Sequence, residues 1–118
     1  MKYMLLIYLD EQALSETERA ECYVESTQLA QDLHSNGQYL AANPLHPAST
    51  ATSVRVRNGE PLVTDGPFAE TREQLGGYFL IDARDLDEAM SIAARIPAAR
   101  RGTVEIRPVI ELPGLPQG

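Results

Sequence analysis

Two segments of the chain are apolar at every position. Residues 3–9 read Tyr-Met-Leu-Leu-Ile-Tyr-Leu, and residues 78–81 read Tyr-Phe-Leu-Ile. Because successive side chains of a strand point to opposite faces of a sheet, both segments predict strands that are apolar on both faces. A sheet built around them needs a cover on each side.

Two further segments have the spacing of amphipathic helices. Ser15 stands three residues before Glu18, a capping-box pattern that predicts a helix from there to about Ser35, before an Asn-Gly pair. Asp85 predicts a second helix, which Pro97 stops. The stripes expected to face the sheet are Ala20, Tyr23, Thr27, Ala30 and Leu33 or His34 in the first helix, and Leu86, Ala89, Met90, Ala93 and Ile96 in the second.

Alternating side chains and turn residues predict the remaining strands. They cover residues 38–42, 53–57, 62–63 and 103–111, and Asn58-Gly59 between the middle two is a strong hairpin signal. The resulting order is strand, helix, strand, hairpin, strand, helix, strand. This order predicts an α+β, ferredoxin-like βαββαβ domain with an inserted β-hairpin and two helices on one face of an antiparallel sheet.

Two helices cover only one face of such a sheet. The other face would expose large apolar side chains from both two-faced strands, each forgoing about 1.5–3 kcal/mol of burial, and such a patch attracts a partner. A second copy laid face to face is the expected cover, which predicts a homodimer; a different protein is the alternative. We expect one domain over residues 1–112 and a Pro- and Gly-containing tail over residues 113–118.

Composition excludes several classes of protein. The chain has 118 residues and a net charge of −7, without a basic stripe, so we expect no nucleic-acid partner. Its apolar runs fall far short of the roughly 20 residues of a membrane span, so we expect no membrane partner. A single cysteine, Cys22, cannot form an internal disulfide, which is typical of a reducing compartment and predicts a cytoplasmic location.

The fourteen residues from Asp65 to Tyr78 closely resemble the signature of the DGPF proteins, a branch of the YCII-related family. Supporting segments are residues 54–59, 85–89, 94–97 and 104–108, so that the resemblance extends from residue 1 to about residue 110. It implies the dimeric α/β-barrel superfamily, in which two ferredoxin-like domains pack sheet to sheet around shared clefts. The activity of the family is unestablished. Some members lie beside genes for extracytoplasmic-function sigma factors, which implies a regulatory role.

The better-studied YCII proteins resemble enzymes with a histidine–aspartate pair. Asp65 matches their aspartate, but their helix histidine falls on Ser26 here, so the pair is incomplete. His46, in a loop, is the residue that could rebuild it. The functional interpretation of Asp65 is a general base or a ligand for a polar group. The alternative, which turn chemistry favours, is an Asx-turn in which its carboxylate accepts backbone N–H groups.

Other candidates carry both a functional and a structural interpretation. Arg55 and Arg57 share one strand face, where they could hold an anion or simply solvate an edge. Phe68 is expected to plug the core rather than to form a substrate platform. Tyr78 could place its hydroxyl in a dimer cleft, although core packing is the default. The residues assigned to ligand binding are Arg55, Arg57, Gly66, Pro67, Phe68 and Tyr78, and those assigned to catalysis are Asp65 and His46.

Three functions remain open from the sequence. The first is a protein that binds a small polar molecule near the dimer interface and acts on it with Asp65. The second is a non-catalytic ligand-binding or accessory module with a regulatory role, and the third is a protein-interaction subunit. Cys22 is interpreted as an apolar filler because no base lies near it in sequence. Because the two histidines lack metal-ligand spacing, we expect neither a metal nor a cofactor.

Overall fold

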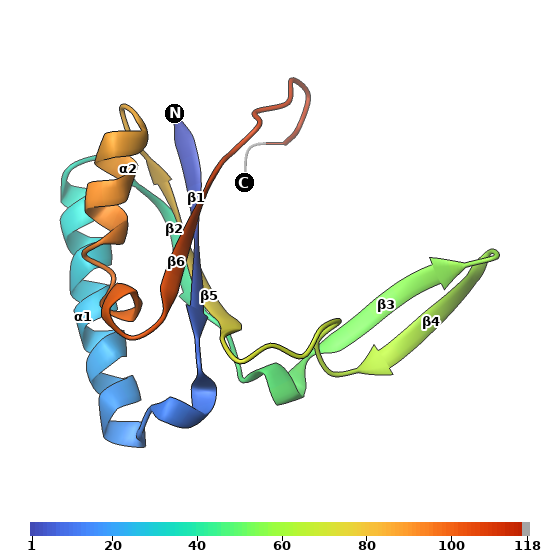
Figure 1. Cartoon of the computed structure of the whole chain (residues 1–118). Coiled ribbons are helices and arrows are strands. Elements are labelled where there is room, and N and C mark those ends of the chain that lie inside the picture. The colour runs from blue at the N-terminus through green and yellow to red at the C-terminus, as the bar shows by residue number, and fades with distance from the viewer. Residues whose placement is uncertain (117–118) are drawn as a thin grey trace.

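The computed structural model describes residues 1–116, which form a four-stranded sheet, a separate two-stranded hairpin and two α-helices (Figure 1). The elements are β1 (Lys2–Leu9), α1 (Glu16–Ser35), β2 (Tyr39–Pro44), β3 (Thr52–Arg57), β4 (Glu60–Asp65), β5 (Gln74–Asp82), α2 (Leu86–Ala93) and β6 (Thr103–Pro108). The sheet has the order β2-β5-β1-β6 and is antiparallel throughout. The predicted α+β class and ferredoxin-like order are confirmed.

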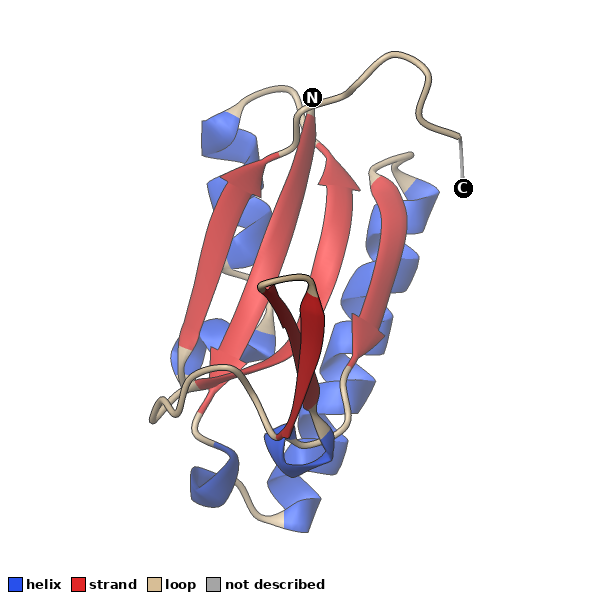
Figure 2. Cartoon of the chain, turned by 90° about the vertical axis from the view of Figure 1, so that its right-hand side faces the viewer, coloured by secondary structure: helices blue, strands red, loops and turns tan. Residues whose placement is uncertain are grey.

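The two-faced strands occupy the centre of the sheet. β1 pairs with β5 on one side and with β6 on the other, so that Leu5 lies between Phe79 and Ile106. Figure 2 shows both helices behind the sheet, on one face. The other face carries no α-helix within residues 1–116, and we call it the open face.

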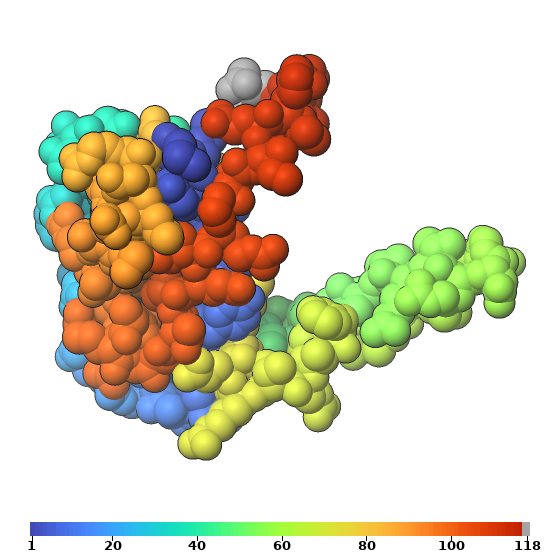
Figure 3. Space-filling view, turned by 45° about the horizontal axis from the view of Figure 1, so that its top comes forward, coloured from blue at the N-terminus to red at the C-terminus, as the bar shows by residue number. Residues whose placement is uncertain are grey.

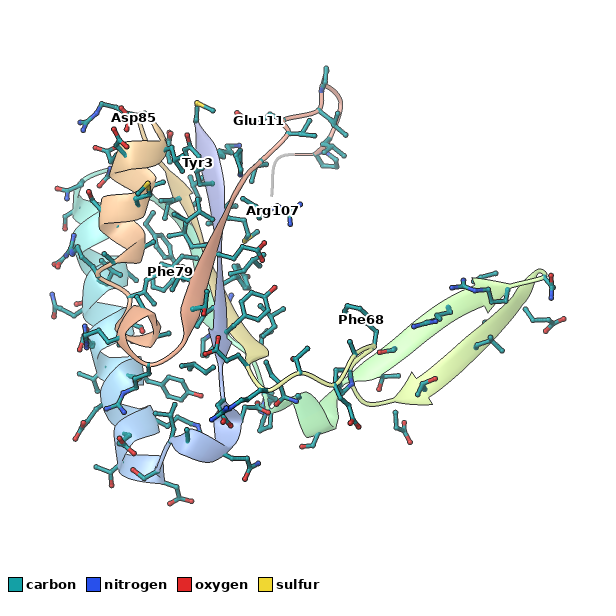
Figure 4. The ribbon with its side chains drawn as sticks, in the orientation of Figure 1. Tyr3, Phe68, Phe79, Asp85, Arg107 and Glu111 are labelled. Carbon is teal, nitrogen blue, oxygen red and sulfur yellow. The ribbon has the colours of Figure 1, made fainter. Side chains whose placement is uncertain are left out.

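The core lies between the sheet and the helices. Tyr3 and Leu5 of β1 point into it, whereas Met4 and Leu6, which alternate with them, are half-buried on the open face. Figure 4 shows Tyr3 on the helix side of β1. The buried set is Tyr3, Leu5, Leu29, Leu33, Phe79, Ile81, Ala83, Ala89, Ile92, Ala93, Ile96 and Ala98.

The buried stripe of α1 differs from the predicted one. Leu29 and Leu33 are buried, but Tyr23 is 47% exposed and Thr27 is exposed. In place of the predicted large side chains, the side of α1 nearest the sheet carries the small residues Cys22, Ser26 and Ala30. The spacing of apolar residues could not show which face of α1 packs on the sheet, because the faces of this helix differ little in hydrophobicity.

The capping predictions hold for both helices. The Ser15 hydroxyl accepts the Glu18 amide at 3.1 Å, and the Glu18 carboxylate accepts the Ser15 amide at 3.0 Å. Asp85 caps α2: its side chain accepts the Glu88 amide at 2.9 Å, and the Glu88 carboxylate accepts the Arg84 amide at 2.9 Å.

The predicted stripe of α2 is also wrong in part. Leu86 and Met90 are half-exposed, and Ile92 is buried in their place. The helix ends at Ala93, so Ile96 enters the core from the turn that follows. Pro97, expected only to stop the helix, opens a short 3-10 helix, Pro97–Arg100.

Strand β5 is longer than predicted and includes Gly76 and Gly77. At Gly77 a side chain would meet the neighbouring strand, because a Cβ there would lie 3.0 Å from the carbonyl oxygen of Asn43. At the other edge of the sheet, β6 stops at Pro108, before the predicted end. Ile110, which falls within the predicted strand, lies beyond the observed one and is 80% exposed.

Strands β3 and β4 pair only with each other within the described residues. Asn58 and Gly59 both have positive φ, 53° and 77°, which fits the tight turn that their sequence predicts. We call this hairpin, Thr52–Asp65, the arm. It leaves the body on the side of the open face, as Figures 1 and 2 both show.

Candidate functional site

A concave space lies between α1 and the sheet. It comprises two adjoining cavities of about 350 and 300 Å³, and we call them together the α1 cavity. Each volume lies at the lower end of the range typical of small-molecule sites. The two share Leu9, Cys22, Tyr23, Pro44 and Gly76.

Small residues on both sides create this space. Cys22, Ser26 and Ala30 follow one another at four-residue steps, so they share one face of α1. Opposite them lies the Gly76-Gly77 segment of β5 and Ala42 of β2. Because none of these residues carries a large side chain, the helix and the sheet leave a gap between them.

The 350 Å³ cavity has a polar rim. Both carboxylate oxygens of Glu11 accept the amide of Ala48, at 3.0 and 3.2 Å, which ties down the loop that carries His46. The guanidinium of Arg19 donates to the Glu11 carbonyl at 3.4 Å. His46 lines the cavity and is exposed, and within residues 1–116 its ring takes part in no hydrogen bond.

The 300 Å³ cavity is mostly apolar, with a few polar groups on α1. The Thr27 hydroxyl donates to the carbonyl of Tyr23 at 2.7 Å, so it is already satisfied. The hydroxyl of Ser26 and the thiol of Cys22 form no hydrogen bond within the described residues. These two groups are therefore the ones in this wall that remain open to a ligand.

Tyr78 belongs to the residues around this cavity, but its side chain lies on the open face because it alternates with the buried Phe79. There its hydroxyl accepts the side-chain amide of Asn43 at 3.0 Å. The core-packing interpretation of Tyr78 is therefore wrong in this chain, and the predicted position facing a partner remains.

A second cluster of polar side chains lies on the open face, where Tyr8 of β1 adjoins Glu105 and Arg107 of β6. Burial raises the pKa of Tyr8, and the charge of Glu105 and a hydrogen bond to it raise that pKa further, while the charge of Arg107 lowers it. Arg107 and Glu105 themselves pair at 3.6 Å. Figure 4 shows Arg107 pointing away from the helices. The open face thus combines an apolar centre with a charged edge.

Asp65 ends β4 at the root of the arm, opposite Thr52. Its carboxylate is exposed and forms neither a hydrogen bond nor an ion pair within residues 1–116, so the expected Asx-turn is not formed. Gly66 makes the turn instead, with φ at 103°. Its amide donates to the carbonyl of Ala51 at 2.7 Å, and its carbonyl accepts the hydroxyl of Ser53 at 2.8 Å.

The interpretation of Phe68 as a core plug is wrong. Its side chain is 81% exposed, and Figure 4 shows it at the root of the arm, away from the helices. Phe68 lies on the loop that joins the root of the arm to β5, and its ring does not reach the core. Pro67, beside it, is half-buried.

Arg55 and Arg57 point to one face of the arm. Arg57 donates to the carbonyl of Val56 at 2.9 Å, and both side chains are exposed. His46 reaches the α1 cavity, whereas neither half of that cavity is lined by Asp65, Gly66, Pro67, Phe68, Arg55 or Arg57. Within one chain, the cavity and the Asp65 loop are therefore separate places.

Glu11, Cys22 and Ser26 line the α1 cavity but are not among the site residues predicted from the sequence. A signal for the cavity was present, because small residues at four-residue steps on a helix, together with a Gly-Gly pair in a strand, indicate missing volume. Within residues 1–116 no group of three His, Cys, Asp or Glu side chains is arranged to hold a metal ion. No helix in that range has the length and apolarity to span a membrane.

These features define a ferredoxin-like α+β protein with a cavity under its first helix and a hairpin arm on the opposite side of the sheet. Residues 1–113 match the YCII-related domain, and the chain belongs to the YCII-related family. It is 36% identical over 118 aligned residues to the uncharacterized protein R00369 of Rhizobium meliloti (strain 1021), a match that covers 92% of each chain. The family expected from the sequence is confirmed, and its DGPF branch stays a prediction.

Proposed function

We propose that this YCII-related protein binds a small molecule in the α1 cavity. The observation that carries the proposal is a cavity with apolar walls and a few polar side chains, Ser26, Cys22 and His46, that lack hydrogen-bond partners within residues 1–116. Sites of this composition suit a ligand with an apolar body and a polar group. The polar group would meet the Ser26 hydroxyl or the His46 ring.

The position of Ser26 supports binding over histidine–aspartate chemistry. By the resemblance described above, Ser26 stands where the better-studied YCII proteins have a histidine. A serine hydroxyl can donate and accept a hydrogen bond, but it is not a base at neutral pH. Compared with that histidine, Ser26 can still hydrogen-bond a ligand, but it cannot act as a catalytic base.

We propose further that the protein is a homodimer joined through its open face. The half-buried Met4, Leu6 and Leu80 lie there, and no part of the described chain covers them. Stacked sheets pack about 10 Å apart, which would bury these side chains against their symmetry mates. The lone Cys22 fits a reducing compartment, so we place the dimer in the cytoplasm.

An enzyme that uses Asp65 is the second candidate. Its support is the uncompensated carboxylate at the root of the arm, together with the family aspartate that Asp65 matches. An Asp65→Asn variant tests this candidate: loss of turnover or ligand binding in a normally folded protein would support it. Normal binding and turnover in the variant would show that Asp65 is not part of the site.

Ligand-observed NMR against a library of small molecules tests the cavity. Ala30→Leu adds volume to the wall of the 300 Å³ cavity, and Gln31→Leu adds a similar side chain at the exposed neighbouring position. We expect ligands that bind the native chain to bind the Gln31 variant equally and the Ala30 variant at least tenfold more weakly. Equal binding to both variants would place the ligand outside the cavity and refute the proposal.

A further inference from the structure

The arm has one apolar face that nothing in the described chain covers. Register places Val54 opposite Val63, and Val56 opposite Pro61, so these four side chains share a face. Val54, Val56 and Val63 are 63%, 60% and 65% exposed. The opposite face holds Arg55 and Arg57.

A ribbon of this kind is not expected to hold its shape alone in water. An isolated two-stranded hairpin is marginally stable at best, and it gains stability by packing its apolar face on another surface. Both outer edges of the arm also lack a neighbouring strand within residues 1–116. The arm therefore has the properties of a segment that is completed by contact with another molecule.

The size of the uncovered surface indicates how large an interface that molecule could form. The chain exposes 8304 Å², whereas a compact monomer of its mass exposes about 6,300 Å². Its radius of gyration is 16.0 Å, against about 13.5 Å for a compact domain of this length. The excess of about 2,000 Å² exceeds the roughly 800 Å² that each partner buries in a standard interface.

The arm and the open face lie on the same side of the molecule. Figure 2 looks onto the open face with the arm in front of it, and Figure 3 shows the arm and the segment after β6 standing off from the body with a hollow between them. Ile110, Leu112 and Leu115 on that segment are exposed as well. A molecule seated on the open face would therefore meet the arm too.

Charge favours a second copy as this molecule. The arm carries two arginines and two carboxylates, Arg55, Arg57, Glu60 and Asp65, and is neutral, while the whole chain has a net charge of −7. An acidic copy can approach a neutral arm without like-charge repulsion from it. A two-fold axis would also pair each arm with the other copy, so that both arms are covered at once.

We infer that the arm is a clasp between subunits: its apolar face packs on the open-face side of a second copy of this chain. The inference rests on the homodimer proposed above and adds which segment holds it together. It also carries Asp65 and Phe68, at the root of the arm, into the interface. The predicted site loop then lies where two chains meet.

Neighbouring residues on opposite faces of β4 provide a matched pair of variants. Val63→Asp places a charge on the apolar face of the arm, and Thr64→Asp places the same charge on the other face at a residue that is also exposed. Sedimentation equilibrium should show a dimer dissociation constant at least about tenfold higher for Val63→Asp, and one within about twofold of native for Thr64→Asp. An equal effect of the two variants, or no effect of either, would overturn the clasp.

A mixed-subunit experiment tests the contact directly. A spin label on Arg55→Cys, in a Cys22→Ala background, is mixed with an unlabelled ¹⁵N-enriched copy, and a label on Gln31→Cys on the helix side is the control. We expect the Arg55 label to broaden the amide signals of open-face residues such as Met4 and Leu80 in the unlabelled copy, and the Gln31 label to leave them sharp. A dimer without this broadening refutes the clasp and keeps the homodimer, whereas a 13 kDa species at every concentration refutes both.

Discussion

Gly77 of β5 lies so close to the backbone of Asn43 in β2 that a Cβ on Gly77 would be 3.0 Å from the Asn43 carbonyl oxygen. The obstacle is backbone, which cannot swing aside as a side chain does. We therefore expect Gly77→Ala to push β2 away from β5 and to lower the free energy of unfolding by about 1–3 kcal/mol.

Gly76 supplies the control for this prediction. It is the preceding residue of the same strand, and the nearest atom to its added Cβ is 3.9 Å away, an ordinary contact. Chemical denaturation of both variants, with the slope checked for two-state behaviour, measures the difference. If Gly76→Ala proves as destabilising as Gly77→Ala, strand propensity and not the approach to Asn43 explains the glycine.

The fold was predictable because it depends on patterns that repeat along the chain. Tyr3 and Met4 alternate between the core and the open face as the two-faced pattern requires, and Ser15 caps α1 through Glu18 as its spacing indicates. The orientation of α1 was not predictable, because Tyr23 and Cys22 are comparable candidates for the core. Which of them faces the sheet depends on how the helix packs against it.

The candidate site was less predictable than the fold. The α1 cavity exists because Ser26 and Gly77 leave volume unfilled, and missing side chains produce no periodic signal. Phe68 was expected in the core because an aromatic ring gains most from burial, yet its side chain is 81% exposed at the root of the arm. Where a loop goes depends on contacts between distant segments, such as the bond from Gly66 to Ala51, that no local pattern encodes.

The capping box of α1 predicts a pH dependence of stability. Hydrogen bonds to the Ser15 backbone and side chain, followed by the bond and charge of Arg101, hold the pKa of Glu18 below its ordinary value of 4.5. Because the folded pKa is depressed, the ionised Glu18 stabilises the native state above the unfolded pKa. This contribution is lost as the pH falls through the lower, folded pKa.

Thermal melts of the native chain and of Glu18→Gln, recorded from pH 7 down to about 2.5, measure this dependence. We expect the native chain to be the more stable at neutral pH and the gap to close below the unfolded pKa. Glu21→Gln, at an exposed position that forms no ion pair within residues 1–116, should show no such gap. A gap that stays constant with pH would mean that the charge of Glu18 contributes nothing.

Glu11 is predicted to order the loop that carries His46. Its carboxylate accepts the Ala48 amide with both oxygens, and a hydrogen bond to a charged group is worth about 1.5–3 kcal/mol. We expect Glu11→Ala to speed hydrogen exchange of the Ala48 amide by at least about tenfold and to weaken any ligand of the 350 Å³ cavity. Gln12→Ala is the control, since Gln12 bonds through its backbone amide alone; unchanged exchange in Glu11→Ala would show that the loop is held by other contacts.

The roles of Asp65 and Gly66 can be separated by one substitution at each. Asp65 is exposed and its carboxylate has no bonding partner in the described chain, so Asp65→Asn should change the free energy of unfolding by less than about 0.5 kcal/mol. Gly66 has a φ of 103°, which side chains disfavour although no atom would block a Cβ there. Gly66→Ala should therefore destabilise the protein by about 1 kcal/mol or more, through backbone strain alone.

Denaturation curves for the two variants decide between a turn role and a functional role for Asp65. A stable Asp65→Asn protein beside a destabilised Gly66→Ala protein would assign the turn to the glycine and leave the carboxylate free for a ligand or a partner subunit. If Asp65→Asn instead melts as early as Gly66→Ala, the carboxylate supports the loop through a contact that the isolated chain lacks. In that case the dimer dissociation constant of Asp65→Asn should also rise, because the clasp places this loop between two subunits.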